Sequence, residues 1–413
     1  MIYHTIYDLS DKNLYSLQAE LSNIEVSKEV IDYMASKFTF KRFYIKNLDY
    51  RAANILKQEA LSCDIDAAIS YKTYTMNPDK TDILLCGSIA QLIKISEKLR
   101  NQPFKLKELG IDLKYLIETK DFNPIKIGKC EIKPDDRCYI MGIINVTPDS
   151  FYSGSRYVSS NIDLASIEKT VEQMIENNVD IIDIGGESTR PASEPVSEEE
   201  EIKRIVPAIE LVRKLTDIPI SIDTYKAKVA QIAIEKGADL INDISALSMD
   251  QNMVKVVKES RKPVVLMHMK GTPKNMQQNP SYENLIDEIY QFFRSKINFC
   301  IENGINEDNI IIDPGIGFGK RYKDNLALTK YIGAFKTLKR PILYAASRKS
   351  FIGRALSETE EPVKPEDRLY GSLAANLIAS NFANILRVHD FKETRQMEIL
   401  KEKIYEVNRF ELH

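Results

Sequence analysis

The sequence lacks the features that would assign it to a membrane, a secretory route or a nucleic acid. No apolar run reaches the roughly 18 to 20 residues of a membrane span, and the first residues lack the basic and apolar segments of a signal peptide. The 57 basic and 60 acidic side chains leave a net charge of -3, which gives no electrostatic support for a nucleic-acid partner. We therefore expect a cytoplasmic protein that acts on neither membranes nor nucleic acids.

Cysteine is scarce, and its spacing carries little chemistry. The five cysteines are Cys63, Cys86, Cys130, Cys138 and Cys300. They form no C-x-x-C pair, and their odd number and wide spacing argue against both a zinc site and a complete set of disulfides. Reduced thiols are the simplest interpretation and agree with a cytoplasmic location.

The 413 residues have the composition of a soluble globular protein, with 43% hydrophobic and 28% charged residues. From residue 140 onward, apolar runs alternate with segments of helical periodicity, and strands are predicted to begin near residues 140, 180, 219, 240, 264, 310, 341 and 384. One predicted helix carries Leu164, Ile167, Val171, Met174 and Ile175 largely on one face, and residues 197–200 predict a helix N-terminus. Eight such repeats predict an α/β protein with a closed parallel (β/α)8 barrel.

The first part of the chain predicts a small α/β domain. Helices are expected over residues 49–62 and 89–100, and strands over 65–70 and 82–86. Residues 121–136 contain two prolines and several lysines and are interpreted as a linker, giving domains 1–125 and 126–413. A chain beginning near Lys126 is expected to keep the barrel fold. The N-terminal part shows no phosphate loop, glycine fingerprint or metal spacing, so an oligomerisation or accessory role is the working hypothesis.

Polar clusters follow the predicted strands, and the carboxyl ends of barrel strands are where active sites form. One set suits a phosphate or pyrophosphate, because it combines cations and backbone donors. Its members are Asn145, the glycines at 185 and 186, Arg190, Arg348, Lys349, Arg387 and His389. Any one of these cations alone is equally well explained as a solvated surface charge; their shared position at strand ends favours a binding site.

A second set consists of short polar side chains that each follow an isoleucine at the barrel mouth, namely Asp223, Asn242 and Asp313. Such a carboxylate can pair with two adjacent N–H donors of a flat heterocycle. Asp313 precedes Pro314 and Gly315, so a turn explains it at least as well when it is taken alone. Three such positions on nearby strands favour a ligand.

Two long loops, residues 146–160 and 185–197, are rich in Gly, Pro, Ser and Thr. Long loops after barrel strands often close over the active site. Asp149 in the first loop, and Glu187, Thr189 and Arg190 in the second, would then reach the site only on closure. Plain flexible connection is the alternative interpretation.

Six motifs occur in an order that resembles the dihydropteroate synthase family, and the resemblance runs from about residue 138 to residue 393. They are residues 142–151 (GIINVTPDSF), 183–191 (DIGGESTRP), 267–273 (MHMKGTP), 313–319 (DPGIGFG), 347–350 (SRKS) and 387–389 (RVH). The resemblance implies a pterin-binding barrel enzyme of folate biosynthesis. Such an enzyme, a transferase, joins p-aminobenzoate to 6-hydroxymethyl-7,8-dihydropterin pyrophosphate and releases 7,8-dihydropteroate and pyrophosphate.

The same resemblance implies roles for individual residues. The pterin would be held by Asp223, Asn242, Asp313 and Lys349. The p-aminobenzoate pocket, where sulfonamides would compete, would be shaped by Thr189, Pro191, Phe318 and Ser350. Pyrophosphate would be bound by Asn145, Arg190, Arg387 and His389, with Asn145 acting in part through Mg²⁺. Lys349, Asp149 and Arg190 would be catalytic, Asp149 by stabilising a cationic methylene carbon, and the enzyme would be a homodimer.

Two departures from the family pattern stand out: the N-terminal extension and a first loop that reads Phe151-Tyr-Ser-Gly-Ser155 without the usual Asp-Gly-Gly. A pterin-dependent methyltransferase is the main alternative, since it shares the aspartate and asparagine contacts but has no use for the pyrophosphate set. A catalytically silent pterin-binding module is a second. A generic phosphate-binding barrel is the fold-level alternative, and it does not require Asp223, Asn242 and Asp313.

Overall fold

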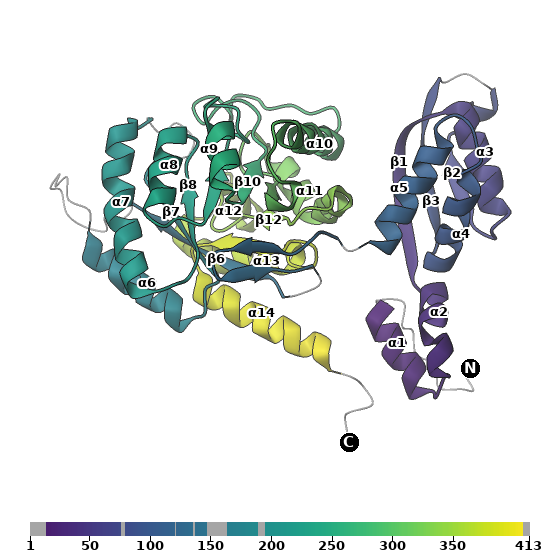
Figure 1. Ribbon diagram of the computed structural model, residues 1–413, viewed down its shortest axis with the longest axis horizontal. Helices are drawn as coiled ribbons and strands as arrows, with labels where there is room; N and C mark the ends of the chain where they lie inside the picture. The colour runs from purple at the N-terminus through teal and green to yellow at the C-terminus, as the bar shows by residue number, and fades with distance from the viewer. Residues whose placement is uncertain are drawn as a thin grey trace. The chain divides into compact units, whose positions relative to one another are not determined.

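A computed structural model describes residues 14–75, 79–119, 121–134, 137–146, 163–188 and 195–407. The chain divides into two compact units between residues 119 and 120 (Figure 1). The boundary predicted at residue 125 therefore falls inside the second unit. Each unit has its own buried core and is described separately.

The second unit is the predicted barrel. Its strands are β6 (Tyr139–Asn145), β7 (Ile181–Gly185), β8 (Ile220–Asp223), β9 (Leu240–Asp243), β10 (Val264–Met267), β11 (Ile310–Asp313), β12 (Leu343–Tyr344) and β13 (Ile385–Val388). All paired strands are parallel, in the order β11-β10-β9-β8-β7-β6-β13-β12. A parallel bridge between Ile312 and Ile342 joins the two ends. The eight strands predicted from the apolar runs are confirmed.

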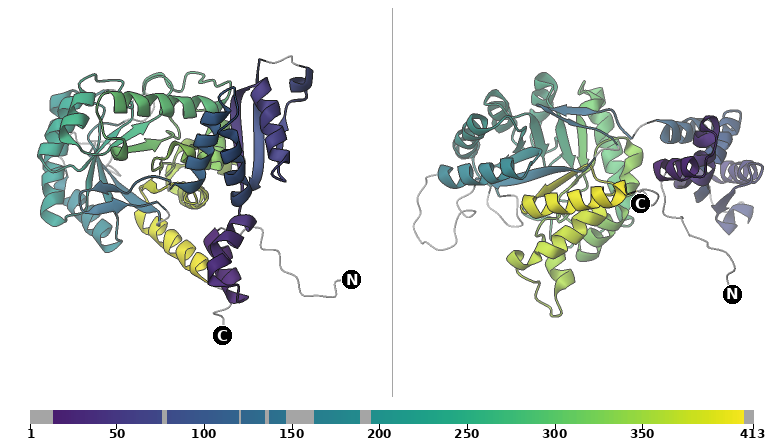
Figure 2. Two further views of the ribbon diagram at one scale, coloured as in Figure 1. Left: turned by 45° about the vertical axis from the view of Figure 1, so that its right-hand side comes forward. Right: turned by 90° about the horizontal axis from the view of Figure 1, so that it is seen from below.

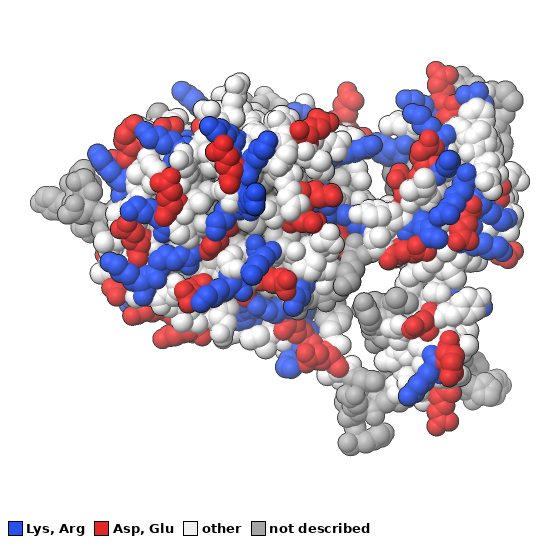
Figure 3. Space-filling view, in the orientation of Figure 1, with Lys and Arg blue, Asp and Glu red and all other residues white. Residues whose placement is uncertain are grey.

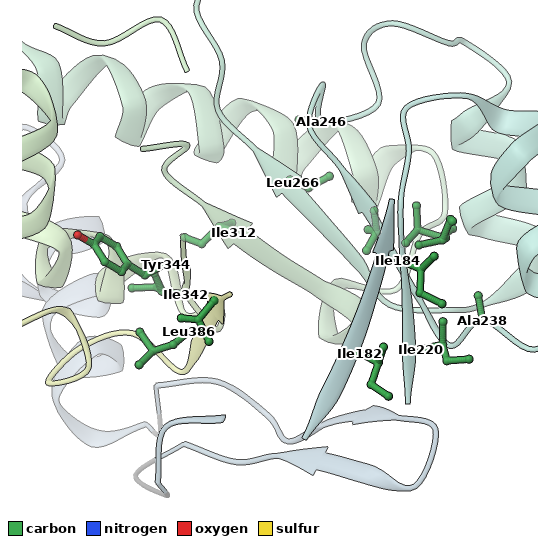
Figure 4. Packing of buried hydrophobic residues seen from close by; sticks show 14 of the residues in the cluster. Ile182, Ile184, Ile220, Ala238, Ala246, Leu266, Ile312, Ile342, Tyr344 and Leu386 are labelled. Atoms are coloured by element: carbon green, nitrogen blue, oxygen red, sulfur yellow. The ribbon is translucent and has the colours of Figure 1, made fainter. Parts of the chain in front are cut away.

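Helices surround this sheet (Figures 1 and 2). They are α6 (Leu164–Glu176), α7 (Glu198–Leu215), α8 (Ala227–Glu235), α9 (Met253–Ser260), α10 (Leu285–Glu302), α11 (Tyr322–Tyr331), α12 (Ser350–Leu356), α13 (Leu369–Ala379) and α14 (Phe391–Glu406). Outward-pointing strand residues such as Ile182, Ile184 and Leu386 belong to the cluster that packs between strands and helices (Figure 4). This burial of both faces explains why the strands are nearly all apolar.

The helix signals have mixed outcomes. The Ser197 hydroxyl accepts a hydrogen bond from the Glu200 backbone N–H and caps α7 as predicted. In α6, the predicted apolar face is buried at Ile167, Val171 and Met174. Leu164 and Ile175, at the two ends of that face, remain exposed because they lie beyond the part covered by neighbouring elements.

The segment interpreted as a linker is partly a β-hairpin, formed by β4 (Ile125–Ile127) and β5 (Cys130–Ile132). Phe122, Ile125, Ile127 and Ile132 are buried in a second cluster with inward-pointing residues from the amino-terminal halves of the barrel strands. The cluster's members from the strands are Tyr139, Met141, Ile181, Leu240, Val265, Ile311, Leu343 and Ile385, and Ala345 joins it from just after β12. The prolines and lysines that suggested a linker lie beside this short alternating apolar pattern. The hairpin thus closes the bottom of the barrel.

The first unit contains α1 (Leu14–Asn23), α2 (Lys28–Phe38), β1 (Phe40–Asp49), α3 (Tyr50–Leu61), β2 (Asp66–Ile69), β3 (Lys80–Ser88), α4 (Ile89–Leu99) and α5 (Leu106–Glu118). Its three strands form an antiparallel sheet in the order β1-β3-β2. The predicted helices and strands correspond to α3, β2, β3 and α4. Strand β1 escaped prediction because its charged and polar residues leave no continuous apolar run, and one of its faces is exposed.

Within the described ranges, no helix combines the length and apolar character needed to cross a bilayer. Basic and acidic side chains are interspersed over the face shown in Figure 3. This mixing agrees with the balanced composition of the chain.

Candidate active site

The polar residues of the barrel mouth follow from strand geometry. Side chains two positions apart on a strand point to the same side, so a residue two places after an inward-pointing core residue also points inward. Ile181, Leu240, Ile311 and Ile385 belong to the cluster at the barrel bottom. Two places along the same strands stand Asp183, Asn242, Asp313 and Arg387. The barrel therefore has an apolar lower layer and a charged upper layer.

A pocket lies at this upper layer, at the carboxyl ends of the strands. It is lined by Asp223, Asn242, Ile244, Met267, Asp313, Phe318, Ala345, Lys349 and Arg387. All four residues predicted to hold the pterin line it, together with one residue predicted for p-aminobenzoate and one predicted for pyrophosphate. Buried acceptors thus face two cations in a space framed by apolar side chains.

Asp313 is both a turn residue and a pocket residue, the two roles that its sequence context allowed. Its Oδ1 accepts a hydrogen bond of 2.7 Å from the Gly315 backbone N–H, which forms the turn expected of Asp-Pro-Gly. Gly315 has a φ of +67°, and a Cβ there would lie 2.0 Å from the carbonyl oxygen of His268, so only glycine fits. Burial raises the pKa of Asp313, while Lys349 acts in the opposite direction. One carboxylate therefore makes a turn and lines the pocket.

Asp223 is a strongly perturbed acid of the pocket. Burial raises its pKa to about 7, the Arg387 guanidinium opposes this rise, and Asp183 adds to it. Its Oδ2 accepts a hydrogen bond of 2.6 Å from an Arg387 Nη atom. Its Oδ1 is buried and has no partner within the described part of the chain. A buried acceptor without a partner, on a side chain that lines a pocket, suits an N–H donor on a ligand.

Arg387, which was predicted to bind pyrophosphate, therefore contacts Asp223, a residue predicted to bind the pterin. Its side chain is only 18% exposed and forms ion pairs with both Asp183 and Asp223. These carboxylates keep its pKa above the ordinary value despite burial. A contact with pyrophosphate stays a prediction for this residue.

Asp183 is a site residue for which the sequence analysis assigned no role. It is completely buried on β7 and accepts hydrogen bonds from Arg387 Nε at 2.7 Å and from Asn242 Nδ2 at 3.3 Å. The signal was present in the sequence as an acidic residue inside the run Ile181-Ile-Asp-Ile184. A charge at an inward position of a buried strand requires partners, which indicates an upper-layer residue.

Lys349 enters the pocket as the N-cap residue of α12. Its ammonium group donates a 2.5 Å hydrogen bond to the Ile316 carbonyl and lies 4.8 Å from the centre of the Phe318 ring. Burial lowers its pKa to about 8, although Asp313 favours the charged form. Ser350, the next residue, is exposed at the start of α12.

Arg348, which was predicted for the anion-binding group, is held by an ion pair, and a contact with an anion stays a prediction for it. It adopts the left-handed conformation with φ 56°, and its guanidinium makes a two-pronged ion pair with Asp390. The Ser347 hydroxyl, one residue earlier, accepts a hydrogen bond from the His389 backbone N–H at 3.2 Å. These contacts join the loops after β12 and β13, so Arg348 positions its neighbours.

His268 and Lys320 form a second structural pair beside the pocket. The Lys320 ammonium group is 2.8 Å from His268 Nδ1 and donates to the His268 carbonyl at the same distance. Burial, followed by the charge of Lys320, lowers the pKa of His268 to about 2. The imidazole therefore stays neutral at ordinary pH and ties the loop after β10 to the loop after β11.

Glu187 is held at the base of the second long loop. Its Oε2 is 2.5 Å from Lys226 Nζ, which also contacts Glu201 Oε2 and donates to the Val196 carbonyl, both at 2.6 Å. The carboxylate that was expected to act on closure is thus engaged in an ion pair with Lys226. Lys226 joins residues on both sides of that loop.

The remaining predicted residues divide into two groups. Asn145 ends β6 and pairs in register with Gly185, and His389 is exposed after β13. Asp149, Thr189, Arg190 and Pro191 lie outside the described residues. Beside the pocket, a cleft of about 540 Å³ includes Ser350 and Gly317 in its lining. The nine described residues to which the family resemblance gives a role thus lie at one end of the barrel, at or after the carboxyl ends of its strands.

Comparison with known proteins identifies the family to which this pocket belongs. Residues 141–389 match the model of the pterin-binding enzyme family. A dihydropteroate synthase of Clostridium beijerinckii is 46% identical over 271 residues, which cover 65% of this chain and 95% of that protein. The chain belongs to the dihydropteroate synthase family of pterin-binding enzymes. The family resemblance seen in the six motifs is confirmed, and the barrel is the part that carries it.

Solved structures of the family agree. A Yersinia pestis dihydropteroate synthase in a sulfonamide complex has a TM-score of 0.61 and 37% identity, covering 68% of this chain and 99% of that one. A Xanthomonas albilineans dihydropteroate synthase in complex with 7,8-dihydropteroate has a TM-score of 0.60 and 33% identity, covering 69% of this chain and all of that one.

One relative extends beyond the barrel. A Helicobacter pylori protein, named a bifunctional dihydropteroate synthase/dihydropteroate reductase, is 36% identical over 382 residues. The match covers 92% of this chain and 94% of that protein. The N-terminal unit therefore has a counterpart in that relative.

Proposed function

We propose that this protein is a dihydropteroate synthase, a transferase that joins p-aminobenzoate to 6-hydroxymethyl-7,8-dihydropterin pyrophosphate. The observation that carries the proposal is the upper-layer pocket, in which Asp223, Asn242 and Asp313 face Lys349 inside a family barrel. A dihydropterin ring is flat and carries several N–H donors as well as acceptors, so this pocket offers partners for both. The products are 7,8-dihydropteroate and pyrophosphate, which places the enzyme in folate biosynthesis.

The substrates divide among the residues of the rim. Asp223, Asn242, Asp313 and Lys349 hold the pterin. The arylamine lies beside Phe318 and Ser350, with Thr189 and Pro191 from the second loop, and sulfonamides compete there. Pyrophosphate contacts Asn145, Arg190, Arg387 and His389.

We place Mg²⁺ beside Asn145, at the carboxyl end of β6. Among the residues that the structure describes, no group of three His, Cys, Asp or Glu side chains forms a metal cage. Mg²⁺ commonly takes one or two protein oxygens together with substrate phosphate oxygens. The single amide oxygen of Asn145 fits that chemistry. When bound, the ion stabilises negative charge on the departing pyrophosphate.

The reaction needs no covalent bond to the enzyme. The C–O bond between the pterin methylene carbon and pyrophosphate breaks, and its electron pair leaves with the pyrophosphate. The dihydropterin ring shares the resulting positive charge, which Asp149 stabilises. The arylamine nitrogen then bonds to the methylene carbon and loses a proton to solvent. The protein's part is to orient both substrates and to stabilise the charges.

Pyrophosphate release tests the synthase reaction directly. The purified protein, with Mg²⁺ and the dihydropterin pyrophosphate, is expected to release pyrophosphate and form dihydropteroate only when p-aminobenzoate is added. In Arg190→Ala, loss of a guanidinium that contacts the substrates should lower kcat/KM for p-aminobenzoate by about tenfold to a thousandfold. Full activity in this variant would contradict the role given to Arg190, and pterin binding without turnover would contradict the synthase function.

A second activity, reduction of dihydropteroate, is proposed for the 413-residue chain. Support comes from the bifunctional Helicobacter pylori relative, whose match includes the N-terminal unit. Reduction adds a hydride to a ring carbon and a proton to the adjacent nitrogen, so a reduced nicotinamide or flavin must supply two electrons. The N-terminal unit is the part that distinguishes this chain from single-barrel relatives.

The test compares the full chain with a version that starts at Lys120, at the division between the two units. Each is incubated with dihydropteroate and a reduced nicotinamide, with and without added flavin, and tetrahydropteroate is measured. We expect reduction by the full chain only. Equal reduction by both versions would assign the activity to the barrel, and absence of reduction by the full chain would refute it.

We further propose a homodimer located in the cytoplasm. Helices α13 and α14, which contact each other, expose large apolar side chains, namely Tyr370, Leu377, Ile378, Leu400, Ile404 and Tyr405. An apolar surface of this kind favours association between protein copies. All five cysteines are free, in keeping with a reducing compartment. Light scattering of the purified chain gives its mass in solution.

A further inference from the structure

We infer that Asp183 is a positioning residue that sets the hydrogen-bonding pattern of the pterin pocket. The inference rests on the proposed synthase function, because it concerns how the ring of that substrate is recognised. Asp183 is completely buried and is not among the residues that line the pocket. It contacts two residues that do line it, Asn242 on β9 and Arg387 on β13.

The first contact decides which way the Asn242 amide points. An ionised carboxylate can only accept hydrogen bonds, so the group that faces Asp183 must be the amide NH₂, at 3.3 Å. The carbonyl oxygen of Asn242 is then the atom available to a ligand. Without Asp183, an asparagine is free to present either end. Asp183 therefore makes Asn242 an acceptor.

The second contact fixes Arg387. Its Nε donates to Asp183 at 2.7 Å, while an Nη atom donates to Asp223 at 2.6 Å. The guanidinium is planar, so holding Nε on one carboxylate also determines where the Nη atoms lie. Asp183 in this way fixes Arg387 against one oxygen of Asp223. The other oxygen of Asp223 has no partner among the residues that the structure describes.

Together these contacts produce a pocket with acceptors on three strands, from Asp223, Asn242 and Asp313. Such a set recognises a ring by several N–H groups at once. A ring with acceptors at those positions would leave buried oxygens unpaired, which is costly. Asp183 contributes to this discrimination without touching the ligand.

The test measures binding of 6-hydroxymethyl-7,8-dihydropterin, which has the ring but no pyrophosphate, by calorimetry. In Asp183→Asn, the new amide can accept from Arg387 and turn its NH₂ toward Asn242. Asn242 must then turn its carbonyl oxygen toward residue 183 and present its NH₂ group to the ligand. We expect the dissociation constant to rise about tenfold to a hundredfold. The KM for p-aminobenzoate should change far less than ring affinity.

An exchange variant tests the orientation itself. In Asp183→Asn combined with Asn242→Asp, the amide at 183 can accept from Arg387 and donate to the carboxylate at 242. That carboxylate offers its second oxygen to the ring, so the acceptor is restored. The exchange variant should bind the ring more tightly than either single variant. If Asp183→Asn does not fold, the exchange variant can still be compared with Asn242→Asp.

Asp243 provides a matched control. Like Asp183, it is a completely buried aspartate at a strand, here β9. Its carboxylate instead caps the following turn by accepting hydrogen bonds from the backbone N–H groups of Ser245 and Leu247. Asp243→Asn should lower the melting temperature and leave the dissociation constant of the ring within about threefold of the wild-type value. Equal weakening of binding in both variants would show a general loss of stability and would overturn the inference.

The pH dependence of ring binding gives a readout that a merely structural role would not change. Asp223 faces the charges of Arg387, Asp183, Glu201 and Asp243, and Lys349 lies across the pocket. Its carboxylate accepts from the ring, so affinity should fall as the pH drops through about 7, where its pKa lies. Removing the negative charge of Asp183 lowers that pKa. The fall should therefore move to lower pH in Asp183→Asn.

Three results would overturn the inference: wild-type affinity in Asp183→Asn, an exchange variant no better than the single variants, or an unmoved pH dependence. Failure of the wild-type protein to bind the dihydropterin would be a different result. It would refute the synthase function and with it the ligand for which the pocket was interpreted. The wild-type titration thus separates the two.

Discussion

Replacement of Lys349 by alanine should abolish turnover, with kcat/KM falling about a hundredfold to a thousandfold or more. The ammonium group lies among buried acceptors and favours the ionised form of Asp313 more than Lys320 or Arg387 does. Its removal weakens the compensation of that buried carboxylate and deprives the pterin of a donor. The same variant should bind 6-hydroxymethyl-7,8-dihydropterin much more weakly. Pyrophosphate release and calorimetry measure the two effects.

Lys296→Ala is the matched control for this substitution. Lys296 is a partly buried lysine on α10 whose pKa burial also lowers, and its ammonium donates to the Ser248 hydroxyl at 2.5 Å. It lies outside the residues that line the pocket. We expect turnover to stay within about twofold of wild type, as for a surface substitution. Retained activity in Lys349→Ala would disprove the role of that lysine.

Removal of the β4–β5 hairpin should unfold the barrel. A chain that starts at Lys133 lacks Phe122, Ile125, Ile127 and Ile132, all buried at the barrel bottom. Burying each side chain of this size contributes about 1.5–3 kcal/mol. The combined loss of roughly 6–12 kcal/mol matches the whole stability of a typical domain, about 5–15 kcal/mol. Circular dichroism and thermal unfolding measure the result.

A chain that starts at Lys120 is the control, since it retains the whole hairpin. It should be soluble, unfold cooperatively and keep the synthase reaction. A start at Lys126 is less favourable than the sequence suggested, because it removes Phe122 and Ile125. If the chain from Lys133 were as stable as the chain from Lys120, the hairpin would not belong to the core of the barrel.

Much of the barrel was predictable because its strands are buried on both faces. Ile181, Leu240 and Ile311 each stand in apolar runs that have no other good explanation in a protein of this composition. The hairpin was not predictable in the same way, since Ile125, Ile127 and Ile132 form runs too short to separate from a loop. Strand β1 failed for a related reason, because one of its faces is exposed.

The site was predictable where a residue's position along a strand already determined its direction. Asp223, Asn242 and Asp313 follow isoleucines at strand ends, and the structure brings them into one pocket. The roles of Arg348 and Asp183 depended on partners distant in sequence, Asp390 and Arg387. Charge and motif alone do not show whether an arginine faces a ligand or a carboxylate.

The two layers of the barrel have a consequence for inherited variation. Ile311 and Asp313 are two positions apart on β11 and face the same side, yet Ile311 packs against the hairpin and Asp313 lines the pocket. Related proteins can therefore differ in the apolar residues near the hairpin, and so in thermal stability, while substrate specificity is preserved. Substitutions that change substrate specificity are instead expected at the inward-facing positions near the carboxyl ends of the same strands.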